Sequence, residues 1–445
     1  MVASIRSGVL TLLHTACGAG ILAMPYAFKP FGLVPGVIMI VVCGACAMQS
    51  LFLQARVANY VPQGRASFSS LTRLINPSLG IVFDLAIAIK CFGVGVSYMI
   101  VVGDLMPQIM SVWTKNAWLL SRKVQISMIM LFFVAPLSFL KKLNSLRYAS
   151  MVAISSVAYL CVLVLVHYVA PSEEILHLKG HVSYFFPQQT HDVNVLKTLP
   201  IFVFAYTCHH NMFSIINEQK STRFGHVMKI PLIAISLALV LYIAIGCAGY
   251  LTFGDSIVGN IIMLYPQTVS STVGRIAIVL LVMLAFPLQC HPARASIHQI
   301  FQHFTGENAT TTVTSLGEPD ESSPLILDNG LDINEIIEEE SIYEPKETPL
   351  KGRSFILITC GILIASYLVA ISVSSLARVL AIVGATGSTS ISFILPGLFG
   401  YKLIGSEHKT AMPLATRLFK YTGLALFILG LVIMFTCLTA ALELN

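Results

Sequence analysis

The stretch Thr15-Ala16-Cys17-Gly18-Ala19-Gly20 interrupts the first apolar segment of the chain, and the stretch Phe204-Ala205-Tyr206-Thr207-Cys208-His209-His210 interrupts the sixth. Both segments are long enough to span a bilayer, which takes roughly 20 apolar residues. Inside lipid, non-helical backbone persists only where protein covers it or where it lines a cavity, because its N–H and C=O groups find no water. Interruptions at corresponding places in two halves of a membrane protein indicate the binding site of a secondary transporter.

The composition places the chain in the membrane. Apolar residues make up 56% of it and charged residues 11%, and the mean hydropathy is +0.81, whereas a soluble domain carries about 25% charged residues. The sequence predicts an all-α polytopic membrane protein with eleven spanning helices, over 7–28, 33–55, 80–112, 124–140, 148–169, 198–217, 227–250, 272–291, 355–374, 380–402 and 419–441.

The distribution of Lys and Arg predicts the orientation. With the N-terminus in the cytosol, 18 of the 27 basic residues fall on the cytosolic side and 8 on the opposite side. Cytosolic loops of membrane proteins carry the excess of Lys and Arg. We therefore expect a cytosolic N-terminus and a C-terminus across the membrane, and we attribute the net charge of +6 to topology and not to a nucleic-acid partner.

One polar segment divides the chain. The stretch 306–353 holds 12 of the 21 acidic residues and the sequon Asn308-Ala309-Thr310. Such a composition buries too little apolar surface to fold. We expect one transporter domain with helices 1–8 in residues 1–300, a disordered acidic cytosolic loop in 301–353 and helices 9–11 in 354–445. The loop is either a tolerated insertion or a regulatory or sorting segment, and a cytosolic sequon stays unmodified.

The sequence contains no signature of an enzyme. All ten cysteines fall inside predicted spans, so no disulfide framework and no metal-ligand spacing is evident. There is no Gly-rich phosphate loop and no nucleophile elbow. We expect neither catalysis nor a cofactor nor a bound metal.

Several motifs together resemble the amino acid/auxin permease family. They are GAGILAMP at Gly18–Pro25, LPIFVFAYTCH at Leu199–His209, FGVGVSY at Phe92–Tyr98, and GATGS at Gly384–Ser388, followed by FILPG at Phe393–Gly397. The resemblance covers about residues 5 to 440 and, within the family, is greatest to fungal vacuolar transporters that export amino acids to the cytosol. It implies a LeuT-like core of two inverted five-helix repeats, helices 1–5 and 6–10, plus an eleventh helix.

The two interruptions are the predicted substrate site. Where a helix unwinds, one half exposes N–H donors and the other exposes C=O acceptors, one kind for each charged group of an amino acid. Glycine lets the backbone approach the substrate. Alternatively, the Gly-Ala-Gly run serves close helix packing and Tyr98 is a core aromatic. The predicted site comprises Thr15, Gly18, Ala19, Gly20, Tyr98, Phe204, Ala205, Tyr206 and Thr207, together with Lys90.

Lys90 lies near the middle of the third span. An ionisable residue at that depth is costly, so it indicates a function or a partner. Three interpretations remain open: it binds the second carboxylate of an acidic amino acid, it supplies a fixed or titrating positive charge, or it pairs structurally with Asp84 or Asp104 of the same helix.

Two histidines are candidate proton sites. Sodium-coupled relatives resemble the first helix closely but carry Asn in place of His14, and they have a Thr in the eighth helix where the stretch 278–287 offers no hydroxyl. This departure argues against sodium coupling. Histidine titrates near neutral pH, so His14 and His209 are candidates for proton coupling. Either could instead be a neutral, hydrogen-bonded interior residue.

The leading hypothesis is proton-coupled amino acid export from the vacuole lumen to the cytosol, by a monomer in the vacuolar membrane. Acidic and neutral substrates are both open, and Lys90 favours acidic ones. Two alternatives are an amino acid sensor of the organelle membrane, which would signal through the 306–353 loop, and a plasma-membrane importer. The lipid bilayer, the amino acid and protons are the expected partners.

Overall fold

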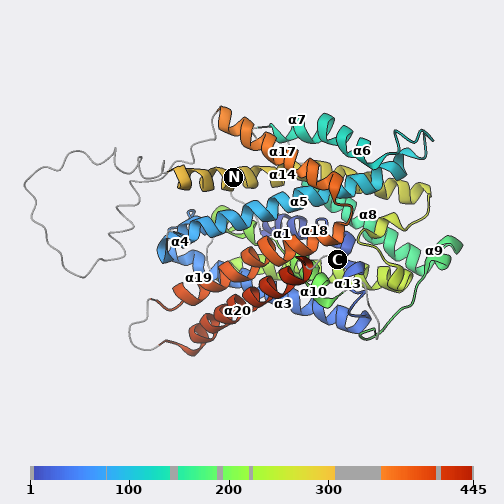
Figure 1. Cartoon of the computed structure of the whole chain (residues 1–445). Helices are drawn as coiled ribbons and strands as arrows, with labels where there is room; N and C mark the ends of the chain where they lie inside the picture. Colours follow the sequence, from blue (N-terminus) through green and yellow to red (C-terminus); the bar gives the residue numbers. More distant parts are fainter. Residues whose placement is uncertain are drawn as a thin grey trace, which may run out of the picture.

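The computed structural model describes residues 5–76, 78–140, 149–187, 194–219, 224–305, 352–406 and 412–442, and every regular element in them is a helix (Figure 1). The predicted loop lies mostly outside these residues, as does its sequon, so its disorder and its role stay predictions.

The helices before the second interruption are α1 (Ile5–Ala16), α2 (Gly20–Ala27), α3 (Leu33–Val57), α4 (Phe68–Ile75), α5 (Leu79–Met110), α6 (Arg122–Ile129), α7 (Ala135–Ser138), α8 (Ala149–Val169), α9 (Glu173–Leu178) and α10 (Val195–Ala205). After it come α11 (Met212–Glu218), α12 (Phe224–Val227), α13 (Lys229–Phe253), α14 (Val269–Thr305), α17 (Arg353–Ser372), α18 (Leu376–Val383), α19 (Leu395–Leu403) and α20 (Leu414–Leu442).

Within the described residues, nine helical stretches are long and apolar enough to cross a bilayer, and the bent pair α1–α2 makes a tenth. The span predicted at 124–140 is present as one uninterrupted helical run, which consists of α6, a π-helical turn at Met130–Val134 and α7. It lies at the short end of the lengths that cross a bilayer, roughly 20 residues, and it packs beside α5.

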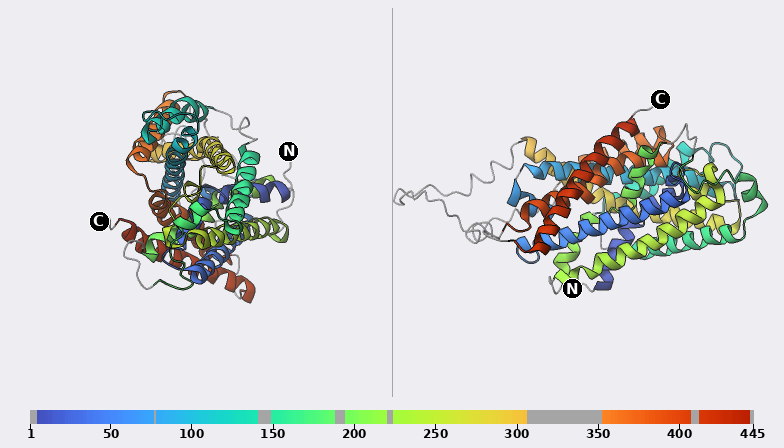
Figure 2. Two further views of the ribbon diagram at one scale, coloured as in Figure 1. Left: turned by 90° about the vertical axis from the view of Figure 1, so that its right-hand side faces the viewer. Right: turned by 90° about the horizontal axis from the view of Figure 1, so that it is seen from below.

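The long helices run side by side in one bundle, with α4 and α9 at opposite ends (Figures 1 and 2). The helix α5 packs along α14, and α13 contacts α1, α2, α3 and α8. The α10 helix lies against α2 and α18. The two interruptions therefore lie in the interior, next to α13.

The segment 180–184, between α9 and α10, fastens one end of the bundle. The Gly180 N–H donates to the carbonyl of Phe253 at the end of α13, and two N–H groups at the start of α3 donate to carbonyls of the segment, each over 2.9 Å. Gly32 begins α3 with a φ of 81°, and a Cβ there would lie 2.2 Å from the Phe185 carbonyl oxygen. The attachment consequently needs glycine at that position.

A further close approach joins α18 to α10. A Cβ on Gly384 would lie 2.2 Å from the Pro200 carbonyl oxygen, a contact with backbone that no side-chain rotation relieves. In α17, by contrast, a Cβ on Gly361 would meet nothing within 4 Å.

Replacing Gly384 by alanine should force the two helices apart. We expect Gly384→Ala to lower the free energy of unfolding by about 1–3 kcal/mol, the range for overpacking. The control Gly361→Ala should be neutral or slightly stabilising, because alanine favours a helix. Thermal unfolding of the purified variants in detergent measures both; equal midpoints would contradict the packing argument.

Candidate functional site

The first interruption is a sharp bend. The α1 helix ends at Ala16 and α2 begins at Gly20, with 56° between the axes of the two halves. Residues 17–19 are non-helical. The unwound backbone is therefore shorter than the stretch 15–20 predicted from the sequence, because Thr15 still belongs to α1 and Gly20 already belongs to α2.

The second interruption is longer but less bent. The α10 helix ends at Ala205, residues 206–208 are non-helical, and a 3-10 turn at His209–Asn211 leads into α11. Phe204 is therefore helical, and Tyr206 and Thr207 begin the unwound part.

The two interruptions meet. A Cβ added to Gly20 would lie 3.1 Å from the Ala205 Cα, so the start of α2 and the end of α10 are nearly in backbone contact. The fold thus brings Gly20 and Ala205, which belong to the two different halves of the chain, next to each other.

One tyrosine connects both helix ends. The Tyr242 hydroxyl of α13 donates to the Ala16 carbonyl (2.8 Å) and to the Ala205 carbonyl (2.6 Å), which close α1 and α10. Its fully buried ring packs edge-on against Tyr206, with the centroids 5.0 Å apart. Sequence reasoning missed Tyr242 because it stands in an uninterrupted apolar helix. The one available signal was its hydroxyl, since a buried tyrosine O–H usually has a partner.

A second hydroxyl reaches the first interruption. A Cβ on Gly18 would lie 3.5 Å from the Tyr98 hydroxyl of α5. The Tyr98 side chain hydrogen-bonds Gln289 of α14, and the Lys90 Nζ donates to the Gln289 Oε1 over 3.2 Å. Gln289, which sequence analysis did not single out, therefore links two of the predicted site residues.

Lys90 is buried without an acidic partner among the described residues. It is 3% exposed, and its Nζ lies 3.3 Å from the His210 Nε2 as well as near Gln289. Asp104 instead pairs with Arg122 at 3.6 Å, and the Asp84 carboxylate faces the Gln299 amide. Structural pairing with either aspartate, one of the three interpretations of Lys90, is thus absent from the described part of the chain.

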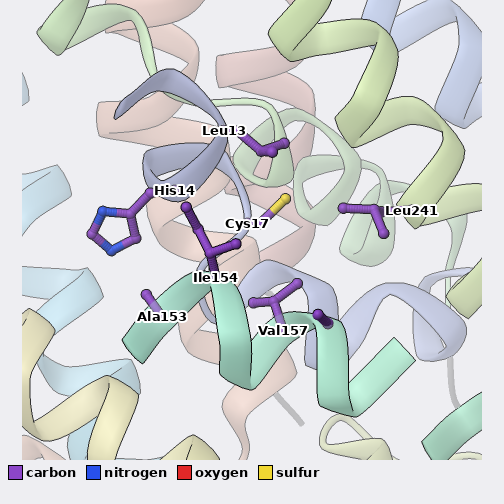
Figure 3. A pocket seen from close by; sticks show the side chains of 8 residues that line it. Leu13, His14, Cys17, Ala153, Ile154, Val157 and Leu241 are labelled. Carbon is purple, nitrogen blue, oxygen red and sulfur yellow. The ribbon is translucent and has the colours of Figure 1, made fainter. Parts of the chain in front are cut away.

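The two candidate proton-binding histidines occupy different surroundings. His209 is fully buried, and its Nε2–H donates to the Ala47 carbonyl of α3 over 3.2 Å. His14 borders a cavity of about 80 Å³ between α1, α8 and α13 (Figure 3). The walls of this cavity are otherwise apolar, apart from the Cys17 thiol.

Hydroxyl groups tie the interruptions to neighbouring helices. The Asn211 Nδ2 donates to the Thr15 Oγ1 over 2.7 Å, which links the second interruption to α1. The Thr207 Oγ1 donates to the Val203 carbonyl and accepts from Ser392, in the π-helical segment Ser390–Ile394. The helix that runs from α18 to α19 thereby borders the same site, and π-helical turns often occur at functional sites.

The architecture defines a transporter of the LeuT-like class. The fold resembles a nucleobase-cation-symport-1 family transporter solved in a closed conformation with bromovinylhydantoin bound, with a TM-score of 0.51 and 12% identity over 98% of this chain and 93% of that one. It also resembles a manganese transporter from Eremococcus coleocola, with a TM-score of 0.54 and 11% identity over 98% and 87% of the two chains. At such identities the likeness establishes the fold alone.

The chain belongs to the transmembrane amino acid transporter family, whose profile matches residues 1–440. It is 86% identical to vacuolar amino acid transporter 6 of Saccharomyces cerevisiae over the full length of both chains, and 52% identical to vacuolar amino acid transporter 5 of that yeast over 99% and 98% of the two chains. It is 25% identical to sodium-coupled neutral amino acid transporter 7 of Danio rerio, over 68% and 66%. The family resemblance is confirmed, and the chain is a transporter and not an enzyme.

The hydrogen bond between Asn211 and Thr15 can be removed by replacing Thr15 with valine, which has nearly the same side-chain shape but no hydroxyl. We expect Thr15→Val to lower the initial rate of amino acid flux in proteoliposomes roughly fivefold, because a lost hydrogen bond of about 1 kcal/mol loosens the two interruptions. The control Thr11→Val, one turn earlier, removes a hydroxyl that bonds only within α1, to the Ser7 carbonyl. Equal rates for the two variants would show that the contact has no role in transport.

Proposed function

We propose that this chain is a secondary active transporter that moves amino acids from the vacuole lumen to the cytosol by alternating access, coupled to protons. The observation that carries the proposal is the meeting of the two helix interruptions around buried polar groups. The family membership and the vacuolar relatives at 86% and 52% identity support the substrate class and the membrane. The proposal includes a monomer with a cytosolic N-terminus and a lumenal C-terminus.

The interruptions suit an amino acid. The backbone at Gly18, Ala19 and Gly20 leads into the N-terminus of α2, and helix N-termini attract anions. The Gly18 N–H donates to the Ala16 carbonyl, so the N–H groups of Ala19 and Gly20 are the donors we assign to a substrate carboxylate. The backbone at Tyr206 and Thr207 supplies acceptors for an ammonium group. The Tyr98 hydroxyl lies over Gly18 and is placed to bind the same carboxylate.

Lys90 supports an acidic substrate. It lies on the same helix as Tyr98, and both contact Gln289. A lysine buried without a counter-charge favours an incoming carboxylate. A glutamate or aspartate held at the interruptions by its backbone groups would direct its side chain toward this ammonium group, whereas a neutral amino acid would leave it unpaired.

Replacing Lys90 should change selectivity more than stability. We expect Lys90→Gln to reduce glutamate flux at least tenfold, the loss for about 1.4 kcal/mol, while neutral amino acids lose less. The control Lys123→Gln removes an exposed lysine at the start of α6. Flux measurements in proteoliposomes give the ratio of glutamate flux to neutral amino acid flux. An unchanged ratio would contradict a role of Lys90 in binding the substrate.

Three histidines in or beside the two interruptions are candidates for binding the coupled proton. His14 and His209 are the candidates from the sequence, and the contact of His210 with Lys90 adds a third. A carboxylate that binds Lys90 would also lie beside His210, whose Nε2 is 3.3 Å from the Lys90 Nζ, and its negative charge would balance a proton at that place. Binding of an acidic substrate would thereby favour uptake of a proton at the same place.

Amino acid efflux from liposomes tests the proposal. With labelled glutamate or a neutral mixture inside at acidic pH, we expect efflux that accelerates as the internal pH falls and is unchanged when choline replaces sodium. Efflux that requires sodium would contradict proton coupling. Binding without flux would contradict transport altogether and favour a sensor.

A further inference from the structure

The carbonyls of Ala16 and Ala205 form an unusual pair. Each closes a half-helix inside the membrane and carries the negative end of that helix's dipole. Both point at the same atom, the Tyr242 hydroxyl oxygen, over 2.8 and 2.6 Å. In transporters built from broken helices, unwound carbonyls and half-helix C-termini are where coupling cations bind.

The hydroxyl has no freedom to leave this place. Tyr242 is fully buried, its ring is held edge-on by Tyr206, and its helix packs against both α1 and α2. One hydroxyl hydrogen is shared by two acceptors, so each carbonyl receives partial positive charge from a donor fixed to α13.

We propose that the Tyr242 hydroxyl takes the place of a monovalent metal cation between the two helix interruptions. The O–H satisfies the two carbonyls permanently, and a cation such as sodium has no vacant position there. Tyr242 is thus a positioning residue, which holds the interruptions in register, and a residue that determines ion selectivity. The inference rests on the proposed transport function, and it places the driving ion elsewhere, because a covalently attached donor cannot cross with the substrate.

The substitution Tyr242→Phe tests this directly, because it keeps the ring and removes the donor. The Ala205 carbonyl then loses its hydroxyl donor and the Ala16 carbonyl keeps only the Gly18 N–H, 2.8 Å away, which we expect to reduce amino acid flux in choline medium roughly tenfold or more. Sodium should restore part of the flux and raise the thermal unfolding midpoint of the purified variant, since the ion can bind the vacated carbonyls.

The matched control is Tyr159→Phe. The half-buried Tyr159 of α8 also donates its hydroxyl to a backbone carbonyl, that of Ser270 over 2.9 Å, but this carbonyl belongs to α14 and not to either interruption. We expect this variant and the unmodified protein to show no response to sodium when sodium chloride replaces choline chloride at equal ionic strength.

Three results would overturn the inference. One is a Tyr242→Phe variant with undiminished flux in choline. Another is a folded Tyr242→Phe variant that sodium neither activates nor stabilises. The third, which needs no variant to fold, is sodium-dependent stabilisation of the unmodified protein. Absence of amino acid flux in the unmodified protein would contradict the proposed function instead, while the sodium-dependent unfolding of Tyr242→Phe would still test the role of its hydroxyl.

Discussion

The fold depends on satisfying backbone carbonyls that a helix leaves open when it stops inside a membrane. Two such carbonyls belong to the buried residues Ala16 and Ala205, and the Tyr242 hydroxyl donates to both, while the Ala16 carbonyl also accepts from the Gly18 N–H. This requires α13 to run beside both interruptions, and it does, in contact with α1 and α2. The near contact of Gly20 with Ala205 then fixes how close the two halves lie.

A second constraint is electrostatic. Lys90 brings an amino group into the interior, and its two hydrogen-bond partners among the described residues, Gln289 and His210, are not acidic. An arrangement of this kind is stable only because the amide oxygen and the imidazole nitrogen solvate the ammonium group in place of water. The same arrangement leaves the charge available to a ligand. Stability and recognition therefore use the same three side chains, carried by α5, α14 and the second interruption.

The interruptions could be predicted because they combine small or polar residues with spans that are otherwise apolar. Tyr242 and Gln289 could not, because their partners are backbone or side chains on other helices and neither interrupts a hydrophobic run. The span at 124–140 could also be predicted from hydropathy, but the π-helical turn at Met130–Val134 within it could not, because it leaves the helix uninterrupted. The partners of Lys90 could not be predicted either. The sequence offered Asp84 and Asp104 only as acidic residues of the same helix, with Asp84 on another face by its spacing, whereas the fold places His210 and Gln289 beside Lys90.

The segment 180–184 is attached to α3 and α13 mainly by hydrogen bonds between main-chain atoms. The attachment therefore depends on two glycines. One is Gly32 before α3, with its φ of 81°, and the other is Gly180 in the segment itself, where a Cβ would meet the Asp255 carboxylate and the Ser256 backbone. The other side chains of the segment take no part in these main-chain hydrogen bonds, so their identity is less constrained. A loop that looks dissimilar between two homologues can therefore close the same end of the bundle in the same way.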